Sequence, residues 1–109
     1  MQFLVYGIGE QPAPLKPEAM AEMGKFMEEA FKAGIVVATG GLHPNGTRIQ
    51  LEGTKVTVTD GPYIEAKDLI PGFAVIQASS KEEAVDWATR FRQILGDGQT
   101  EIVQVYGPA

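Results

Sequence analysis

The sequence predicts an α+β fold: a ferredoxin-like βαββαβ domain with an antiparallel sheet and an inserted β-hairpin. Two amphipathic helices, at residues 17–33 and 80–95, alternate with short apolar segments of strand length. Alternating apolar and polar residues at 47–59 have the pattern of a hairpin. A length of 109 residues suits one domain, spanning residues 1–109, with a single core.

The first strand is predicted at residues 2–8, and the proline-containing segment 9–14 ends it. Pro17 suits the first turn of a helix, where its missing N–H costs nothing. Apolar residues then recur at steps of three and four, and Gly34 can end the helix in the left-handed conformation. The apolar stripe consists of Met20, Met23, Phe26, Met27, Ala30 and Phe31.

The second strand is predicted at 35–38, and it leads into a loop at 39–44. The hairpin then pairs 47–52 with 55–59 around a turn at Glu52-Gly53 or Gly53-Thr54. Either turn places the same four apolar residues on one face, because the two registers differ by an even step. These residues are Ile49, Leu51, Val56 and Val58.

The second half of the chain starts with a turn at 60–63 and continues with a strand at 73–78. Ser80 and Glu83 have the spacing of a capping box, which opens the second helix. Gly96-Asp97-Gly98 ends that helix, and the last strand is predicted at 101–106.

The sheet is expected to need a partner. Residues 3–8, 35–38, 73–78 and 102–106 are apolar at both odd and even positions, so both faces of the sheet would be apolar. Two helices cover only one of these faces. The remaining face would exceed the apolar patch that monomers usually expose. We therefore expect a homodimer through the open sheet face. In the alternative, the hairpin folds across that face, although a hairpin is narrow for four strands.

Composition argues against several functions. The net charge is −5, and the 9 basic residues are scattered, so nucleic-acid binding is not expected. One histidine and no cysteine leave too few ligands for a metal site, and no cofactor is predicted. The chain has no apolar stretch long enough to indicate a membrane span. The lack of cysteine suits a cytoplasmic location. Gly7 and Gly9 lack the third glycine of a dinucleotide fingerprint.

Several motifs resemble those of one family. Gly40-Gly41-Leu42, the hairpin, the segment 60–68 that begins Asp-Gly-Pro, and Gly72-Phe73 are together similar to the YCII-related proteins. The likeness is to their Asp-Gly-Pro-Phe subgroup, with Tyr63 where phenylalanine is usual. It implies a dimeric α/β barrel, in which two domains pack sheet against sheet and small ligands bind between sheet and helices or in the barrel. YCII proteins are credited with a His–Asp pair whose histidine lies on the first helix, where this chain has none.

Candidate site residues cluster around the Asp-Gly-Pro segment. Asp60 is a candidate catalytic base, and His43 could complete an acid–base pair with it. The alternatives are that Asp60 caps a turn through nearby N–H groups and that His43 is solvated. Candidate ligand-binding residues are Gly41, Arg48, Tyr63 and Lys67. Gly41 would let the backbone approach a ligand, and Arg48 and Lys67 could bind an anion. These polar residues could equally be solvent-facing.

Three functional hypotheses follow. The first is a homodimer that binds a small molecule in a pocket between sheet and helices, without a cofactor. The second is an acid–base lyase or isomerase acting on a small cyclic or phenolic compound through Asp60 and His43. The third is an accessory module that binds other proteins in a transcriptional stress circuit. The residues alone leave open whether the protein is an enzyme.

Overall fold

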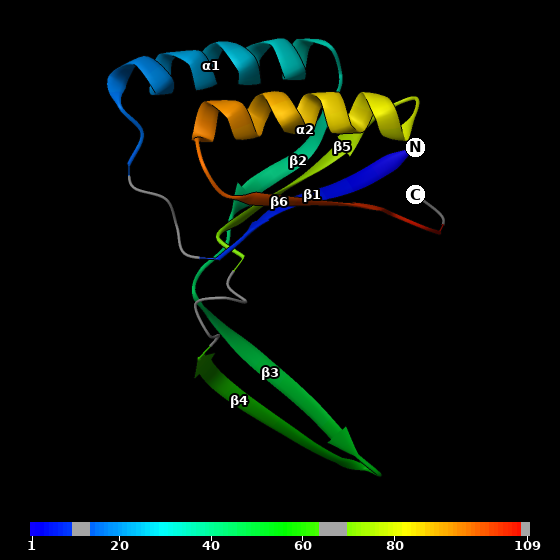
Figure 1. The fold of residues 1–109 in the computed structure, drawn as a ribbon. Coiled ribbons are helices and arrows are strands. Elements are labelled where there is room, and N and C mark those ends of the chain that lie inside the picture. The colour runs from blue at the N-terminus through cyan, green and yellow to red at the C-terminus, as the bar shows by residue number, and fades with distance from the viewer. Residues whose placement is uncertain (10–13, 64–69, 108–109) are drawn as a thin grey trace.

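The predicted order of elements is present in the structure (Figure 1), a computed structural model that describes residues 1–9, 14–63 and 70–107. The first half contains β1 (Gln2–Ile8), α1 (Pro17–Lys32) and β2 (Val36–Gly41), followed by the hairpin strands β3 (Asn45–Glu52) and β4 (Lys55–Tyr63). The second half contains β5 (Gly72–Gln77), α2 (Lys81–Leu95) and β6 (Gln99–Gln104).

The main sheet has the strand order β2-β5-β1-β6, and all neighbouring strands are antiparallel. The two central strands are β5 and β1, each followed in the chain by a helix that returns over the sheet to an edge strand. Both helices lie on the same side of this sheet, and no other helix or strand of the described residues lies on its other side (Figure 1). The ferredoxin-like βαββαβ prediction with an inserted hairpin is therefore confirmed.

The helix ends follow the local signals in the sequence. Pro17 is the first residue of α1, and Gly34 beyond its end has a φ of 71°, which glycine adopts without strain. At the start of α2 the Ser80 hydroxyl accepts a hydrogen bond from the Glu83 N–H at 3.1 Å. The Glu83 carboxylate accepts in return from the N–H and the hydroxyl of Ser79. The second hydrogen bond of the capping box therefore comes from Ser79, one residue before Ser80, which was expected to donate it.

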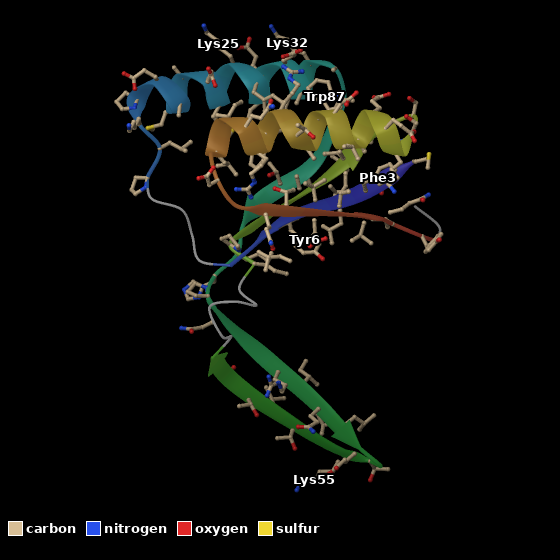
Figure 2. All side chains as sticks on the ribbon, in the orientation of Figure 1. Phe3, Tyr6, Lys25, Lys32, Lys55 and Trp87 are labelled. Carbon is tan, nitrogen blue, oxygen red and sulfur yellow. The ribbon has the colours of Figure 1, made fainter. Side chains whose placement is uncertain are left out.

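The core lies between the helices and one face of the main sheet. Phe3 and Val5 from β1 and Ile76 from β5 are at most 7% exposed, and they point toward the helices. Ala30 and Ala84 are almost completely buried on the facing sides of α1 and α2. Figure 2 shows Phe3 on the helix side and Tyr6 on the opposite side, as the alternation of a strand requires.

The opposite face of the sheet is also apolar, as predicted. Leu4 pairs with Val75 on one side and with Val103 on the other, and Tyr6 pairs with Phe73. These five residues share the face that the helices do not cover. Val103 of β6 is 49% exposed, although it is a β-branched apolar residue.

The hairpin forms a separate two-stranded sheet that extends away from the main sheet (Figure 1). Glu52 pairs with Lys55, so the turn is Gly53-Thr54. The pairs Ile49–Val58 and Leu51–Val56 lie on one face, as the alternation predicted. These four residues are 61–73% exposed. The alternative in which the hairpin folds across the open sheet face therefore does not describe this chain.

Two segments expected as loop or turn belong to strands. β2 continues through Gly40 and Gly41, because both residues pair with the main chain of the neighbouring β5. β4 continues to Tyr63, and the predicted turn at 60–63 is wrong. The register passes from Thr47–Asp60 to Asn45–Tyr63, so β4 contains one extra residue. This is a β-bulge, and Gly61 accommodates it with a φ of 73°.

Candidate functional site

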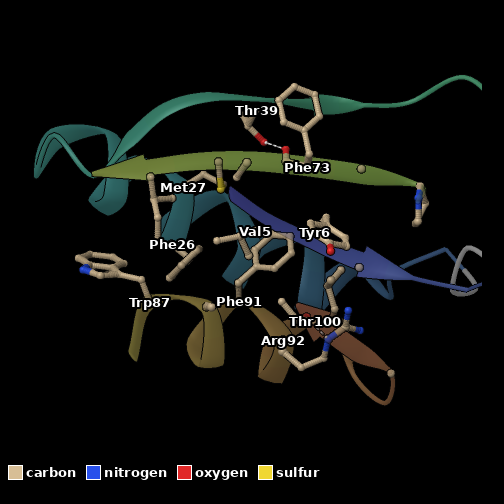
Figure 3. Close-up of a pocket in the computed structure, with 18 of the residues that line it drawn as sticks. Val5, Tyr6, Phe26, Met27, Thr39, Phe73, Trp87, Phe91, Arg92 and Thr100 are labelled. Carbon is tan, nitrogen blue, oxygen red and sulfur yellow. Dashed lines mark hydrogen bonds between the residues drawn. The ribbon is translucent and has the colours of Figure 1, made fainter. Parts of the chain in front are cut away.

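A cavity of about 580 Å³ lies between the two helices and the main sheet (Figure 3). Its walls come from α1, from α2, from β1, β2 and β5, and from the start of β6. This volume falls in the range of pockets that hold small organic molecules. The largest side chains in its wall are Tyr6, Phe26, Phe73, Trp87 and Phe91.

One face of α2 forms much of the wall. Trp87, Ala88, Phe91, Arg92 and Leu95 line the cavity, and their spacing of one, three, one and three residues follows the helical repeat. The sequence places four apolar side chains and one cation on this face. The cavity is consequently apolar along most of α2 and charged near its C-terminal end.

The apolar end of the cavity is held by an aromatic cluster. The Phe26 ring of α1 has its centroid 5.7 Å from that of Trp87 and 6.2 Å from that of Phe91. Arg90 covers the outside of this cluster, with its Cζ atom 5.1 Å from the Phe26 centroid and 4.9 Å from the Trp87 centroid. The two helices are thus joined by aromatic contacts.

Arg90 also joins α2 to α1 by an ion pair with Glu29. The hydrogen bond from Arg90 is the main cause that lowers the pKa of Glu29 below its ordinary value of 4.5. The same hydrogen bond raises the pKa of Arg90. Both side chains are about half exposed. The ion pair therefore orients the two helices relative to each other but adds little to the free energy of unfolding.

The polar end of the cavity is organised around Arg92. Its Nε donates to Thr100 Oγ1 at 2.8 Å, and its Nη2 donates to the carbonyl oxygen of Gln99 at 3.0 Å. Figure 3 shows Arg92 and Thr100 toward one end of the cavity and Trp87 and Phe26 toward the other. The guanidinium is therefore held in one orientation at the opposite end from the aromatic cluster.

Two glycines make room for the Arg92 guanidinium. A Cβ atom at Gly98 would lie 2.5 Å from Arg92 Nη1, which real atoms do not tolerate. A Cβ atom at Gly7 would lie 3.2 Å from Nη2. Gly98 also has a φ of 150°, which side chains rarely adopt. The position of the Arg92 side chain thus depends on two glycines, which have no side chain: one in β1 and one in the segment before β6.

The predicted catalytic candidates lie near the base of the hairpin, outside this cavity wall. Asp60 in β4 accepts a hydrogen bond from Thr47 Oγ1 of β3 at 3.0 Å. His43 Nδ1 accepts from the N–H of Asn45 at 3.2 Å. Both side chains are exposed, and no hydrogen bond or ion pair joins them in the described part of the chain. Their predicted acid–base role stays a prediction.

The predicted ligand-binding residues are spread over several elements. Gly41 ends β2, where it pairs with Gly72, and Arg48 lies exposed in β3 opposite Thr59. Neither residue lines the cavity. Tyr63 is the last residue of β4, and Lys67 lies outside the described residues. The structure therefore does not gather Gly41 and Arg48 into the cavity between sheet and helices.

Within residues 1–9, 14–63 and 70–107, no group of three or more histidine, cysteine, aspartate or glutamate side chains could hold a metal ion. None of the helices in these ranges is long and apolar enough to cross a membrane.

Sequence reasoning missed Arg92 and Thr100 among the polar residues of the cavity. Arg92 was one of the scattered basic residues, yet it lies within the apolar stripe of its helix, four residues after Ala88 and three before Leu95. A cation inside such a stripe is a usable signal, because arginine is seldom buried without a partner. Thr100 gave no signal, since only the pairing of β6 with β1 places it beside Arg92.

The fold and the cavity define a ferredoxin-like α+β domain with a pocket of the size that small molecules occupy. Residues 1–107 match the family model of the YCII-related domain. The chain therefore belongs to the YCII-related family, as the Gly-Gly-Leu and Asp-Gly-Pro segments indicated. No curated protein sequence matches the chain significantly.

One solved structure similar to this chain is 5-chloro-2-hydroxyhydroquinone dehydrochlorinase from Burkholderia phenoliruptrix, in complex with 2,5-dihydroxybenzoquinone. The two are 15% identical, with 99% of this chain and 96% of that chain covered and a TM-score of 0.47.

Proposed function

We propose that this protein is a homodimer that binds a small, mainly apolar molecule in the cavity between the helices and the main sheet. The observation that carries the proposal is the cavity itself, at about 580 Å³. Concave, mainly apolar pockets with a few convergent polar groups are the usual form of a ligand site. A bound molecule would complete the packing between Phe26, Trp87 and the sheet.

Trp87 provides a direct readout of occupancy. It is the only tryptophan of the chain, and it lines the cavity. A neutral aromatic probe, N-phenyl-1-naphthylamine, should gain fluorescence on binding and should accept excitation energy from Trp87. Saturable binding with one probe per chain, accompanied by quenching of Trp87, is the expected result.

A variant that fills the cavity tests whether the probe binds there. Ala88 lines the wall from α2, so Ala88→Leu should place extra methyl groups in the cavity and weaken probe binding at least about tenfold. Ala21→Leu, an equal change at an exposed position of α1, is the matched control and should leave binding unchanged. Equal affinities in Ala88→Leu and Ala21→Leu would place the probe on an outer apolar surface and overturn the proposal.

The second copy is proposed to cover the open face of the main sheet. Leu4, Val75 and Val103 form a continuous apolar row across three strands there. The hairpin points away and leaves this row uncovered (Figure 1). Association of two such faces would remove the apolar surface from water, as the resemblance to a dimeric α/β barrel also implies.

Light scattering after size exclusion should give twice the chain mass at micromolar concentration. Val75→Lys would place a charge at the centre of the dimer contact, and should raise the dissociation constant at least about 100-fold. Gln93→Lys adds the same charge on an exposed position of α2 and should leave the dimer intact. A wild-type protein that elutes as a monomer would refute the dimer.

A further inference from the structure

The cation at the polar end of the cavity is oriented by its neighbours but not neutralised by them. Both hydrogen-bond partners of Arg92 are uncharged oxygens, on Thr100 and Gln99. Among the described residues, no carboxylate lies within 4.0 Å of its guanidinium nitrogens. The guanidinium carries five N–H donors, and Nη1 makes none of the hydrogen bonds found in the described part of the chain. Donors therefore remain available for another acceptor.

The described residues around Arg92 favour the binding of an anion there. Arg92 is partly buried and lines the cavity, so its charge has lost part of its hydration. Asp97 is the one carboxylate among the described residues that lines the same cavity, but it is exposed and makes no ion pair with Arg92. Gly7 and Gly98 let the guanidinium lie close against their backbone, which holds it at this end of the cavity.

We propose that Arg92 forms an anion subsite at this end of the cavity, so that the ligand is a small aromatic or alicyclic molecule with one acidic group. This inference rests on the proposed function of the cavity. A guanidinium binds a carboxylate or sulfonate through two parallel N–H donors, and partial burial strengthens that contact. The rest of the cavity wall is mainly apolar, with its aromatic cluster at the far end. A cavity that is mainly apolar and has one cation at its end matches a ligand with an apolar ring and one negative charge.

A matched pair of probes separates the charge from the ring. 1-Anilinonaphthalene-8-sulfonate carries a sulfonate, and N-phenyl-1-naphthylamine has the same rings without it. The wild-type protein should bind the sulfonate at least about tenfold more tightly than the neutral probe, and this preference should shrink at high salt. Both affinities are measured by titration, with Trp87 quenching as the second readout.

Substitution of Arg92 tests the subsite directly. Arg92→Gln should weaken binding of the sulfonate at least about tenfold and change the affinity of the neutral probe less than about twofold. Lys81→Gln removes an exposed cation of the same helix that does not line the cavity, and should leave the sulfonate preference unchanged. If Arg92→Gln does not fold, Thr100→Val serves instead. It removes the oxygen that orients Nε, keeps the charge, and should reduce the sulfonate preference about threefold or more.

The outcomes distinguish this inference from the function on which it rests. If the neutral probe binds in the cavity but the sulfonate binds no more tightly, the anion subsite is refuted and the proposed function stands. If Arg92→Gln weakens both probes equally, Arg92 only supports the wall, and the subsite is again refuted. If neither probe binds the wild-type protein, the proposed function fails, and the subsite fails with it.

Discussion

The hairpin and the helix-covered sheet both contain apolar strand residues, but in opposite environments. Ile76 in β5 is 5% exposed, whereas Ile49 in β3 is 73% exposed, although both are isoleucines within strands. The difference is that α1 and α2 return over β5, whereas nothing in the described chain returns over the hairpin (Figure 1). An apolar strand pattern therefore predicts a face to be covered, but the connections of the chain decide whether the same chain covers it.

The largest effect is expected in the helix-covered region. Phe26 is 7% exposed and packs on Trp87 and Phe91, so Phe26→Ala should lower the free energy of unfolding by about 3–5 kcal/mol. Phe31→Ala on the same helix, at a position 54% exposed, should cost less than about 1 kcal/mol. Urea unfolding followed by circular dichroism measures both. Equal losses would mean that Phe31 is also covered, and the contrast between the two regions would weaken.

The apolar face of the hairpin is expected to be covered by the second copy in the dimer. An isolated two-stranded hairpin is marginal in water, and its four apolar residues are not covered by the described part of their own chain. The double change Ile49→Ser with Val58→Ser should therefore raise the dimer dissociation constant about tenfold in sedimentation equilibrium.

The control for this prediction lies on the other face of the same strands. Gln50→Ser with Thr57→Ser alters the opposite side of the hairpin, where the two residues pair directly. This double variant should leave the dissociation constant unchanged. If both double variants leave it unchanged, the hairpin stays in water in the dimer as well.

The Glu29–Arg90 pair should give a smaller, pH-dependent effect in the helix layer. Glu29 has a lowered pKa when folded because Arg90 donates to its charged form, so folding favours the carboxylate. The contribution to stability is fully present above pH 4.5, and it is lost as the pH falls through the lower folded-state pKa. The stability difference between wild type and Glu29→Gln should therefore shrink below pH 4.5.

Denaturant unfolding at several pH values measures this difference. In an Arg90→Gln background, Glu29→Gln should have no such pH dependence, because the partner that lowers the pKa is gone. A pH dependence that persists in that background would assign it to another group.

The smallest effect is expected for Asp60 in the hairpin. Its carboxylate accepts a hydrogen bond from Thr47 at an exposed position, and an asparagine oxygen can accept the same bond. Asp60→Asn should change the free energy of unfolding by less than about 0.5 kcal/mol. A large loss in thermal unfolding would show that the charge itself is needed in the folded protein.

Much of the fold was predictable because the signals are local. Pro17, Gly34 and Ser80 each act on their own helix end, and alternation alone placed Ile49 and Val58 on one face. The failures have a different origin. The segment 60–63 has the composition of a turn, but pairing with β3 kept it in a strand, and Gly61 absorbed the extra residue as a bulge. Pairing between distant segments overrides local preference in such cases.

The sequence by itself determined the two amphipathic helices, the strands with two apolar faces and the family to which the chain belongs. Only the tertiary structure decided where the cavity lies and which residues complete it. Gly7 is far from Arg92 and Thr100 in the chain, and it meets them only because β6 pairs with β1 beneath α2. Periodicity reports the face on which a side chain lies. The partner that this face meets depends on packing between distant segments, which no local pattern encodes.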